Sequence, residues 1–280
     1  MVESAEANKD SQVSTFSRIM RPSDGVCWIT GASGGIGRAT AVRLADDGWT
    51  VYATARNPER LDDLQAQVSG RGKVIPASGD VTDPKAMAEI VSRITETSPL
   101  ALALLNAGIY TPMRAENFRA DTAREMFTVN LGGVANGLEP VLRYMIARHD
   151  GHIALTASVA GYRGLPDAAA SSATKAGLIA RAEALARDLV DLGVRISVIN
   201  PVFVKTDASA VIELDMPFLM QPEQAAERIV LGLKRPGFEI AFPRRFAFLL
   251  RAVGMLPNQA YIATMRWMTG WGKRSNRAET

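Results

Sequence analysis

The sequence of 280 residues is 47% hydrophobic and 22% charged, a balance typical of a soluble globular protein with one large core. Its formal net charge of +3 is unevenly placed: residues 236–280 hold seven basic and two acidic side chains, so residues 1–235 sum to −2. The main part of the chain therefore gives no reason to expect nucleic-acid binding.

The first 21 residues are polar and lack the apolar core of a signal peptide, so we expect a flexible N-terminal extension there. No stretch of the sequence reaches the roughly 18 apolar residues expected of a membrane-spanning helix. Cys27 is the sole cysteine, so no disulfide can form within the chain, which fits a reducing, cytoplasmic location.

Short apolar runs alternate with segments of helical periodicity over residues 22–242. The runs predicted as strands are Val26–Thr30, Thr50–Ala55, Val74–Ala77, Leu100–Leu105, Ile153–Ala157, Arg195–Ile199 and Glu239–Phe242. The predicted helices include Ile36–Asp47, Pro84–Thr97, Ala123–Arg148 and Ser172–Leu192. This alternation is typical of right-handed crossovers and of a sheet covered on both faces. We predict an α/β, doubly wound Rossmann fold with a mostly parallel seven-stranded sheet over residues 22–242, followed by a basic amphipathic extension over residues 243–280.

A glycine-rich turn, Thr30-Gly31-Ala32-Ser33-Gly34-Gly35-Ile36-Gly37, joins the first predicted strand directly to a helix. Glycines let the backbone turn tightly and approach a pyrophosphate, whose charge is favoured at a helix N-terminus. A plain tight turn has a similar composition, but the position between a strand and an amphipathic helix favours dinucleotide binding.

Arg56 follows the second predicted strand, where an acidic residue would bind the ribose hydroxyls of NAD. No acid occurs before Glu59, and a guanidinium offers a planar fork of donors suited to the 2′-phosphate of NADP. The alternative is an exposed surface arginine, and we expect NADP(H).

Asp80 and Asn106-Ala107-Gly108 follow the third and fourth strands, and taken singly each fits ordinary turn or helix-entry chemistry.

Together these strand ends resemble the short-chain dehydrogenase/reductase family over about residues 25–237. The matching positions are Thr30-Gly31, Gly35, Gly37, Asp80, Asn106-Ala107-Gly108, Asn130, Ser158, Lys175 and Asn200-Pro201 with Thr206. The resemblance implies that NADP(H) is bound by Gly31, Ser33, Gly35, Ile36, Gly37, Arg56, Asp80, Val81, Asn106, Gly108, Lys175, Val204 and Thr206. Val202 departs from the family, which usually has glycine after Pro201, and a β-branched residue there restricts the backbone beside the nicotinamide.

The resemblance also implies hydride transfer between the nicotinamide and a carbonyl or carbinol carbon, for which the family uses Asn, Ser, Tyr and Lys. Ser158 would hydrogen-bond the substrate oxygen, and Lys175 would bind the nicotinamide ribose and lower the tyrosine pKa. Asn130 would hold a water that continues a proton path to the lysine. The structural alternatives are an ordinary strand-end hydroxyl for Ser158, a solvated helix lysine for Lys175 and a helix-interrupting amide for Asn130.

The family tyrosine lies four residues before the lysine, and that position is Ser171. A phenol has a pKa near 10, which a neighbouring ammonium can lower, whereas a serine hydroxyl is far less acidic and shorter by a ring. A well-placed general acid contributes about 10²–10⁴ in rate, so we expect impaired activity. Tyr162 is a conceivable substitute, although a wall of the substrate pocket is the favoured interpretation.

Met216 and Phe218 lie where the family carries its mobile substrate lid, and with Tyr162 they are the expected lining of a pocket for an apolar substrate. Packing of these lid residues against the body is an equal alternative. Beyond the last strand, Arg245–Leu256 is amphipathic, and Tyr261–Thr269 begins a further helix. Three interpretations of this extension compete: a pocket cover, a subunit contact, or a basic helix on anionic lipid. Packing on the body or on a partner is favoured.

The sequence thus predicts an NADP(H)-dependent oxidoreductase acting on a small apolar ketone or secondary alcohol, in which Ser171 is an engineered knock-out or a natural departure. Two alternatives stay open: a non-catalytic NADP(H)-binding protein, and another reaction in the same pocket, such as imine reduction or an elimination. The helices predicted over 123–148 and 172–192 match those that pair subunits in the family, so we expect a homodimer or homotetramer. No metal is expected, and His149 and His152 are assigned no catalytic role.

Overall fold

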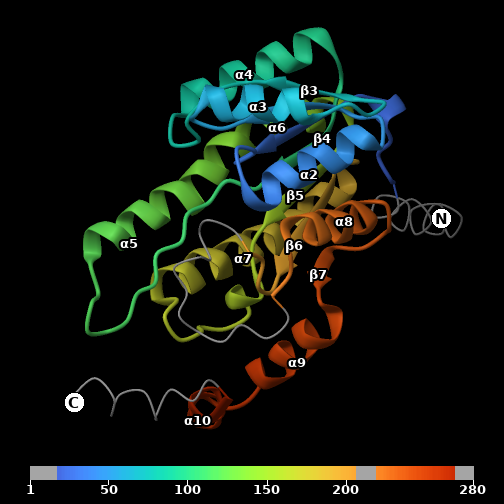
Figure 1. Cartoon of the computed structure of the whole chain (residues 1–280). Coiled ribbons are helices and arrows are strands. Elements are labelled where there is room, and N and C mark those ends of the chain that lie inside the picture. The colour runs from blue at the N-terminus through green and yellow to red at the C-terminus, as the bar shows by residue number, and fades with distance from the viewer. Residues whose placement is uncertain (1–17, 206–218, 269–280) are drawn as a thin grey trace, which may run out of the picture.

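The computed structural model describes residues 18–205 and 219–268 (Figure 1). Its strands form one parallel sheet in the order β3-β2-β1-β4-β5-β6-β7. They are β1 (Val26–Thr30), β2 (Thr50–Thr54), β3 (Lys73–Pro76), β4 (Leu100–Leu105), β5 (His152–Thr156), β6 (Arg195–Pro201) and β7 (Glu239–Phe242). The predicted Rossmann fold is confirmed, and every predicted strand lies within two residues of an observed one.

Helices connect the strands and cover the sheet. They are α2 (Gly35–Asp46), α3 (Pro58–Gln67), α4 (Pro84–Thr97), α5 (Ala120–Phe127), α6 (Val134–Arg148), α7 (Ala169–Asp191) and α8 (Pro222–Leu233). Two short 3-10 helices are η1 (Pro22–Asp24) and η3 (Val159–Gly161). Neither α3 nor α8 is among the helices named from the sequence. α3 buries only Leu61 and Leu64, so its periodic signal is weak.

The helix predicted over Ala123–Arg148 is not one regular α-helix. A π-helical stretch, η2 (Thr128–Gly133), lies between α5 and α6, and the cap residues on both sides of it keep right-handed helical angles. The apolar periodicity continues across this stretch, which explains why the sequence predicted a single helix. Asn130 lies inside the π-helical stretch.

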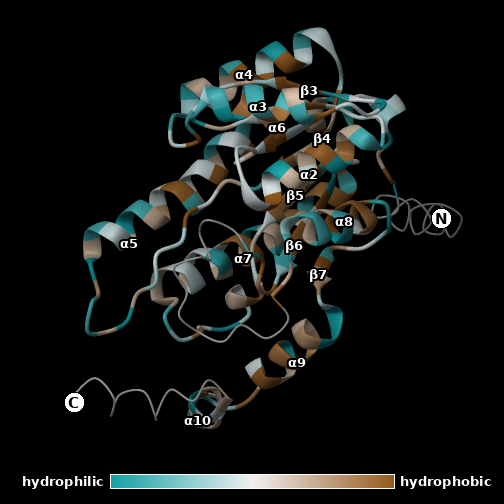
Figure 2. Ribbon diagram, in the orientation of Figure 1, coloured by the Kyte–Doolittle hydropathy of each residue, from teal (hydrophilic) through white to brown (hydrophobic). Residues whose placement is uncertain are grey.

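Successive residues of each strand serve two separate cores, because side chains alternate between the faces of a sheet. Cys27 and Ile29 of β1 pack with residues of α2, α3 and α8 on one face. Val26 and Trp28 pack with residues of α4, α6 and α7 on the other. Figure 2 marks the hydrophobic residues along the strands and helices in brown. The sheet is therefore buried on both faces, as its continuous apolar strands require.

Part of the segment predicted to be a flexible extension is packed against the body. Met20 is buried in the core that contains Leu44 and Trp49, and Arg18 forms an ion pair with Asp150. The prediction is therefore wrong for residues 18–21, because the two apolar residues Ile19 and Met20 in a polar segment are too few to give a periodic signal of burial. Residues 1–17 lie outside the described part.

The C-terminal extension forms two helices beyond β7, α9 (Arg244–Gly254) and α10 (Asn258–Met268). α9 begins one residue before the amphipathic segment predicted over Arg245–Leu256, and α10 begins three residues before the helix predicted over Tyr261–Thr269. Both lie at one end of the molecule (Figure 1), where α9 packs against the end of β7 and against η3. Among the described helices, none combines the length and the apolar character needed to cross a membrane.

Candidate active site

Close backbone contacts explain the glycines of the turn after β1. Gly31 has a φ of +69°, and a Cβ there would lie 2.7 Å from the Cα of Ala107. A Cβ on Gly37 would lie 2.2 Å from the carbonyl oxygen of Gly31. Larger residues would push the turn away from the end of β4, so glycine is required at both positions.

The amino end of α2 meets this turn at the carboxyl edge of the sheet. The residue that precedes the helix is Gly34, which has no side chain to cap it, and the helix begins at Gly35 and Ile36. The backbone N–H groups of a first helical turn have no partner within the helix. Uncapped, they fit a pyrophosphate, whose negative charge the helix dipole favours. Ser33 and Ile36 are partly exposed at this turn.

Arg56 and Asp80 lie close together at the ends of β2 and β3. The Asp80 carboxylate accepts hydrogen bonds from the backbone N–H of Thr82 at 2.9 Å and from its hydroxyl at 2.8 Å. The backbone hydrogen bond from Thr82, together with its hydroxyl and the charge of Arg56, lowers the pKa of Asp80. The next residue, Val81, is buried, and its carbonyl accepts a hydrogen bond from Asn136.

The Asn106-Ala107-Gly108 segment is bonded to the end of β1. The Thr30 hydroxyl oxygen accepts from the backbone N–H of Asn106 at 3.0 Å and from that of Ala107 at 3.1 Å. The Asn106 side-chain amide donates to the carbonyl oxygens of Thr30 and Gly31 at 3.3 Å each. The glycine-rich turn and the end of β4 therefore form one unit.

Asn130 is fully buried and joins three elements. Its amide oxygen accepts from the backbone N–H of Ile109 at 2.8 Å, and its amide nitrogen donates to the Ile109 carbonyl at 3.0 Å. The same nitrogen donates to the Thr174 hydroxyl of α7 at 3.2 Å. In this arrangement the Asn130 side chain holds protein groups in place, and its side-chain oxygen and nitrogen both have partners.

Lys175 extends from α7 toward the ends of β4 and β5. Its ammonium donates to the Thr156 carbonyl at 3.0 Å. A Cβ on Gly108 would lie 3.7 Å from the Lys175 nitrogen and 3.2 Å from the Asn130 amide oxygen. Burial lowers the Lys175 pKa to about 8. The structure thus brings Gly108, Asn130 and Lys175 together.

Ser158 precedes η3 just beyond β5 and caps that helix. Its hydroxyl accepts from the Ala160 N–H at 3.2 Å and donates to the Pro201 carbonyl at the end of β6, also at 3.2 Å. Ser171 is buried on α7, one helical turn before Lys175, so the two residues share a helix face. The Ser171 carbonyl accepts a hydrogen bond from the Thr174 hydroxyl at 2.8 Å.

Two tyrosines beyond strand ends have their hydroxyl groups engaged elsewhere. The Tyr162 hydroxyl donates to the Glu239 carboxylate of β7, and burial together with that carboxylate raises the Tyr162 pKa. The Tyr110 hydroxyl donates to the Asp167 carbonyl at 3.2 Å, and burial raises the Tyr110 pKa to about 12. Neither phenol is acidified by its surroundings.

Two of the residues singled out after β6, Val202 and Val204, are buried. Val204 is buried and pairs with Met220 in an isolated parallel bridge. Val202 is buried with Ala247 and Leu250 of α9. Thr206, Met216 and Phe218 lie outside the described residues.

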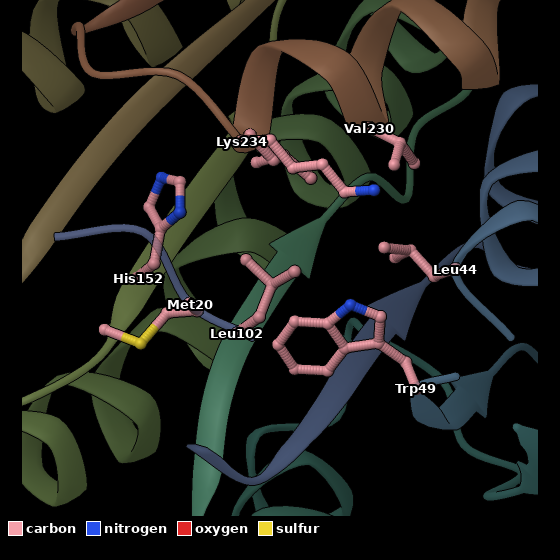
Figure 3. A pocket seen from close by; sticks show the side chains of 8 residues that line it. Met20, Leu44, Trp49, Leu102, His152, Val230 and Lys234 are labelled. Atoms are coloured by element: carbon pink, nitrogen blue, oxygen red, sulfur yellow. The ribbon is translucent and has the colours of Figure 1, made fainter. Parts of the chain in front are cut away.

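A small pocket lies at the opposite, amino edge of the sheet (Figure 3). Its lining includes Met20, Trp49, His152 and Lys234. Burial and the charge of Arg195 hold the pKa of His152 well below its usual range, so its imidazole is neutral. The pocket contains none of the residues predicted for the site. Among the described residues, no cluster of side chains could hold a metal ion.

Thr174 is absent from the site residues predicted from the sequence, and no role is predicted there for the Thr30 hydroxyl. Both hydroxyls connect predicted site residues across distant parts of the chain. Threonine on a helix or at a strand end is common, so only the fold could have indicated their partners.

Residues 25–216 match the protein family described as short chain dehydrogenase. Among curated relatives, an uncharacterized oxidoreductase of Myxococcus xanthus is 36% identical over 240 residues, which cover 85% of this chain and 95% of the relative. The 3-oxoacyl-(acyl-carrier-protein) reductase FabG of Thermotoga maritima is 34% identical over 189 residues, covering 67% of this chain and 77% of that protein.

Among solved structures, an alcohol dehydrogenase of the archaeon Thermococcus sibiricus, complexed with 5-hydroxy-NADP, is similar with a TM-score of 0.70. It is 26% identical, and the match covers 78% of this chain and 95% of that chain. The similarity thus extends over most of the sheet and the helices that carry the site.

Proposed function

The chain belongs to the short-chain dehydrogenase/reductase family and is an NAD(P)-dependent oxidoreductase of that type. From this premise we propose that it uses NADP(H) to act on a small apolar ketone or secondary alcohol. One observation carries the proposal. The glycine-rich turn, Arg56, Asp80, Ser158 and Lys175 all lie at one edge of the parallel sheet, beyond the carboxyl ends of its strands.

The residues at this edge fit a phosphorylated dinucleotide. The uncapped amino end of α2 suits the pyrophosphate, and the exposed Arg56 suits an additional phosphate on the ribose. Asp80 is ionised and can accept hydrogen bonds from the adenine. The similar alcohol dehydrogenase was solved with an NADP derivative, which supports the same choice here.

When bound, the nicotinamide supplies the hydride donor or acceptor. Ser158 is placed to hydrogen-bond the substrate oxygen, after its hydroxyl turns from the Pro201 carbonyl. Lys175, when protonated, favours negative charge on a nearby oxygen, and this effect is strong because the ammonium is buried. Asn130 joins the segment after β4 to α7 through its hydrogen bonds to Ile109 and Thr174. These bonds fix the distance between Gly108 and Lys175.

We infer that Ser171 stands where the proton-donating tyrosine of the family stands. The spacing to Lys175 and the buried position on the same helix face support this assignment. The hydroxyl of Ser171 is shorter by a ring and far less acidic than a phenol, so proton transfer to the substrate oxygen is slowed. Tyr162 does not replace it, since its hydroxyl is bound to Glu239.

The decisive experiment replaces Ser171→Tyr and follows NADPH oxidation with a panel of hydrophobic ketones. We expect a rate increase of about 10²–10⁴, the contribution of a well-placed general acid. Ser171→Phe, which adds the ring without the hydroxyl, is the matched control and should not gain activity. Equal rates for the original chain and for Ser171→Tyr would contradict the assigned role of this position.

A second candidate is a non-catalytic NADP(H)-binding protein. It is favoured by one observation: both phenols near the site have other partners, Glu239 for Tyr162 and the Asp167 carbonyl for Tyr110. Saturable NADPH binding without turnover, in both the original chain and Ser171→Tyr, would favour this candidate. Turnover by the original chain would instead indicate another acid or another reaction, such as imine reduction.

A further inference from the structure

The inner sides of α9 and α10 are fixed to the body by Arg163, which lies in the loop after η3. Its guanidinium donates to the carbonyl oxygens of Gly254 and Leu256 at 2.6 Å each, and it lies 4.3 Å from the centre of the Tyr261 ring. The Tyr261 hydroxyl donates to the Gly164 carbonyl at 2.6 Å. The end of α9 and the start of α10 are therefore held against this loop.

A second anchor connects α9 to β7. Arg251 forms an ion pair with Glu239 at 2.8 Å and lies 4.6 Å from the centre of the Tyr162 ring. Ala247 and Leu250 of the same helix are buried. Since the inner sides already have partners on the body, the outer sides of both helices stay turned away from it.

These outer sides are unusually apolar. Of the ten large hydrophobic side chains exposed among the described residues, six lie within Arg244–Met268, which is a small part of the described chain. Phe248, Met255 and Trp267 are 74%, 79% and 82% exposed. Phe248 of α9 and Met255, which directly follows this helix and keeps helical angles, are seven residues apart and so lie on one side. Figure 2 shows hydrophobic residues along α9. Single exposed apolar residues are normal, but a group of this kind marks an interaction surface.

The charge of the same segment has one sign. Arg244–Met268 contains four arginines and no acidic residue. Arg251 is paired with Glu239, whereas Arg244, Arg245 and Arg266 are exposed and form no ion pair with any described residue. The sequence that follows adds Lys273, Arg274 and Arg277 against Glu279.

Exposed apolar side chains together with arginines that have no ion pair within the described part of the chain indicate which kind of partner fits this surface. A second copy of the chain, docked through the same surface about a two-fold axis, would bring the arginines of both copies into one contact that contains no acidic residue of this segment. An anionic lipid surface instead offers opposite charge to the arginines and an apolar boundary to the phenylalanine, methionine and tryptophan. We propose that the outer side of α9 and α10 binds peripherally to anionic membranes. This inference does not depend on the cofactor or the substrate.

The first test is sedimentation of the full chain with phosphatidylcholine vesicles that do or do not contain phosphatidylglycerol. We expect binding only to the anionic vesicles, and less binding at high salt. Reversing two charges, Arg244→Glu with Arg245→Glu, should weaken binding roughly tenfold or more, given the attraction of each basic residue to an anionic surface. Arg71→Glu with Arg93→Glu makes the same change in net charge elsewhere on the surface and should leave binding unchanged.

The second test addresses the apolar contacts. Phe248→Ser should weaken vesicle binding, whereas Phe118→Ser, at an exposed phenylalanine outside this segment, should not. In a Trp271→Phe background, Trp267 fluorescence should shift to the blue with anionic vesicles, because Trp28 and Trp49 are already buried. The proposal is overturned by absent binding, by equal binding to neutral vesicles, or by equal losses in the control variants. It is also overturned if Phe248→Ser dissociates an oligomer while vesicle binding persists, since the surface would then be a subunit contact.

Discussion

At the scale of single residues, the proposed preference for NADP(H) depends mainly on Arg56. Its side chain is exposed after β2, and its charge contributes to the lowered pKa of Asp80. The 2′-phosphate of NADP would give this guanidinium a charged partner, whereas the ribose hydroxyls of NAD carry no charge.

We therefore expect Arg56→Asp to weaken the binding of NADP much more than that of NAD. Losing hydrogen bonds to a charged group costs about 1.5–3 kcal/mol, roughly 10- to 100-fold in affinity for NADP. Titration calorimetry with both dinucleotides measures the difference, and Arg93→Asp on α4 is a control with the same change in charge. Equal losses for NADP and NAD would contradict the assigned role of Arg56.

Lys175 should make stability depend on pH in a defined direction. Burial lowers its pKa from 10.5 to about 8, so between these values the unfolded chain binds a proton that the folded chain does not. The free energy of unfolding therefore rises with pH across this window, and the cost of burying the charge is fully present below about pH 8. Urea unfolding between about pH 7 and about pH 10 should show this rise in the original chain relative to Lys175→Met. Parallel pH profiles for the two proteins would show that the lysine pKa is not lowered.

At the scale of elements, the π-helical stretch η2 explains how Asn130 reaches two other elements. Asn130 is bonded to Ile109 beyond β4 and to Thr174 on α7, and both bonds arise from a single buried side chain. A π-helical stretch changes which residues of a helix face the sheet. The helix therefore presents an amide at the site and still packs its apolar residues on both sides of η2.

The turn between β1 and α2 is predicted to tolerate no side chain at Gly37. A Cβ there would overlap the carbonyl oxygen of Gly31, so Gly37→Ala must displace the turn from the end of β4. Overpacking of this kind typically costs about 1–3 kcal/mol, and the displaced turn should also lose affinity for NADPH. Thermal unfolding and fluorescence titration with NADPH measure the two effects. Gly164→Ala is the matched control, because a Cβ at Gly164 meets nothing within 4 Å; similar losses in both variants would contradict the argument.

At the scale of the whole molecule, the exposed side of α7 supports the expected subunit pairing. Ala173, Ala176, Ala180 and Ala184 recur at helical spacing and are all exposed. Small side chains of this kind allow two helices to approach closely. We expect a dimer or tetramer in which α7 contributes to the contact.

Sedimentation velocity over a range of protein concentrations tests this expectation. Ala180→Glu should shift the protein toward monomer, because it places a charge in the contact. Ala88→Glu, at an exposed alanine on α4, should leave the assembly unchanged. A monomer at every concentration would exclude pairing of the subunits, and equal effects of the two substitutions would exclude α7 as the contact.

The strands and most of the site were predictable because they depend on local sequence. Apolar runs bounded by glycine, aspartate and asparagine define the strands, and parallel strands necessarily end at one edge of the sheet. Gly31, Arg56, Asp80, Asn106 and Ser158 could therefore be assigned to one region from their place after a strand.

The sequence by itself determined the order of strands and helices, the glycine-rich turn and the position of Ser171 one helical turn before Lys175. Only the tertiary structure decided that Tyr162 bonds to Glu239 and that Arg163 holds the C-terminal helices. It also decided that Met20 belongs to the core. Local periodicity reports which side of an element is buried, but it carries no information on which distant residue completes a hydrogen bond or fills a gap, because that choice depends on the packing of the whole chain.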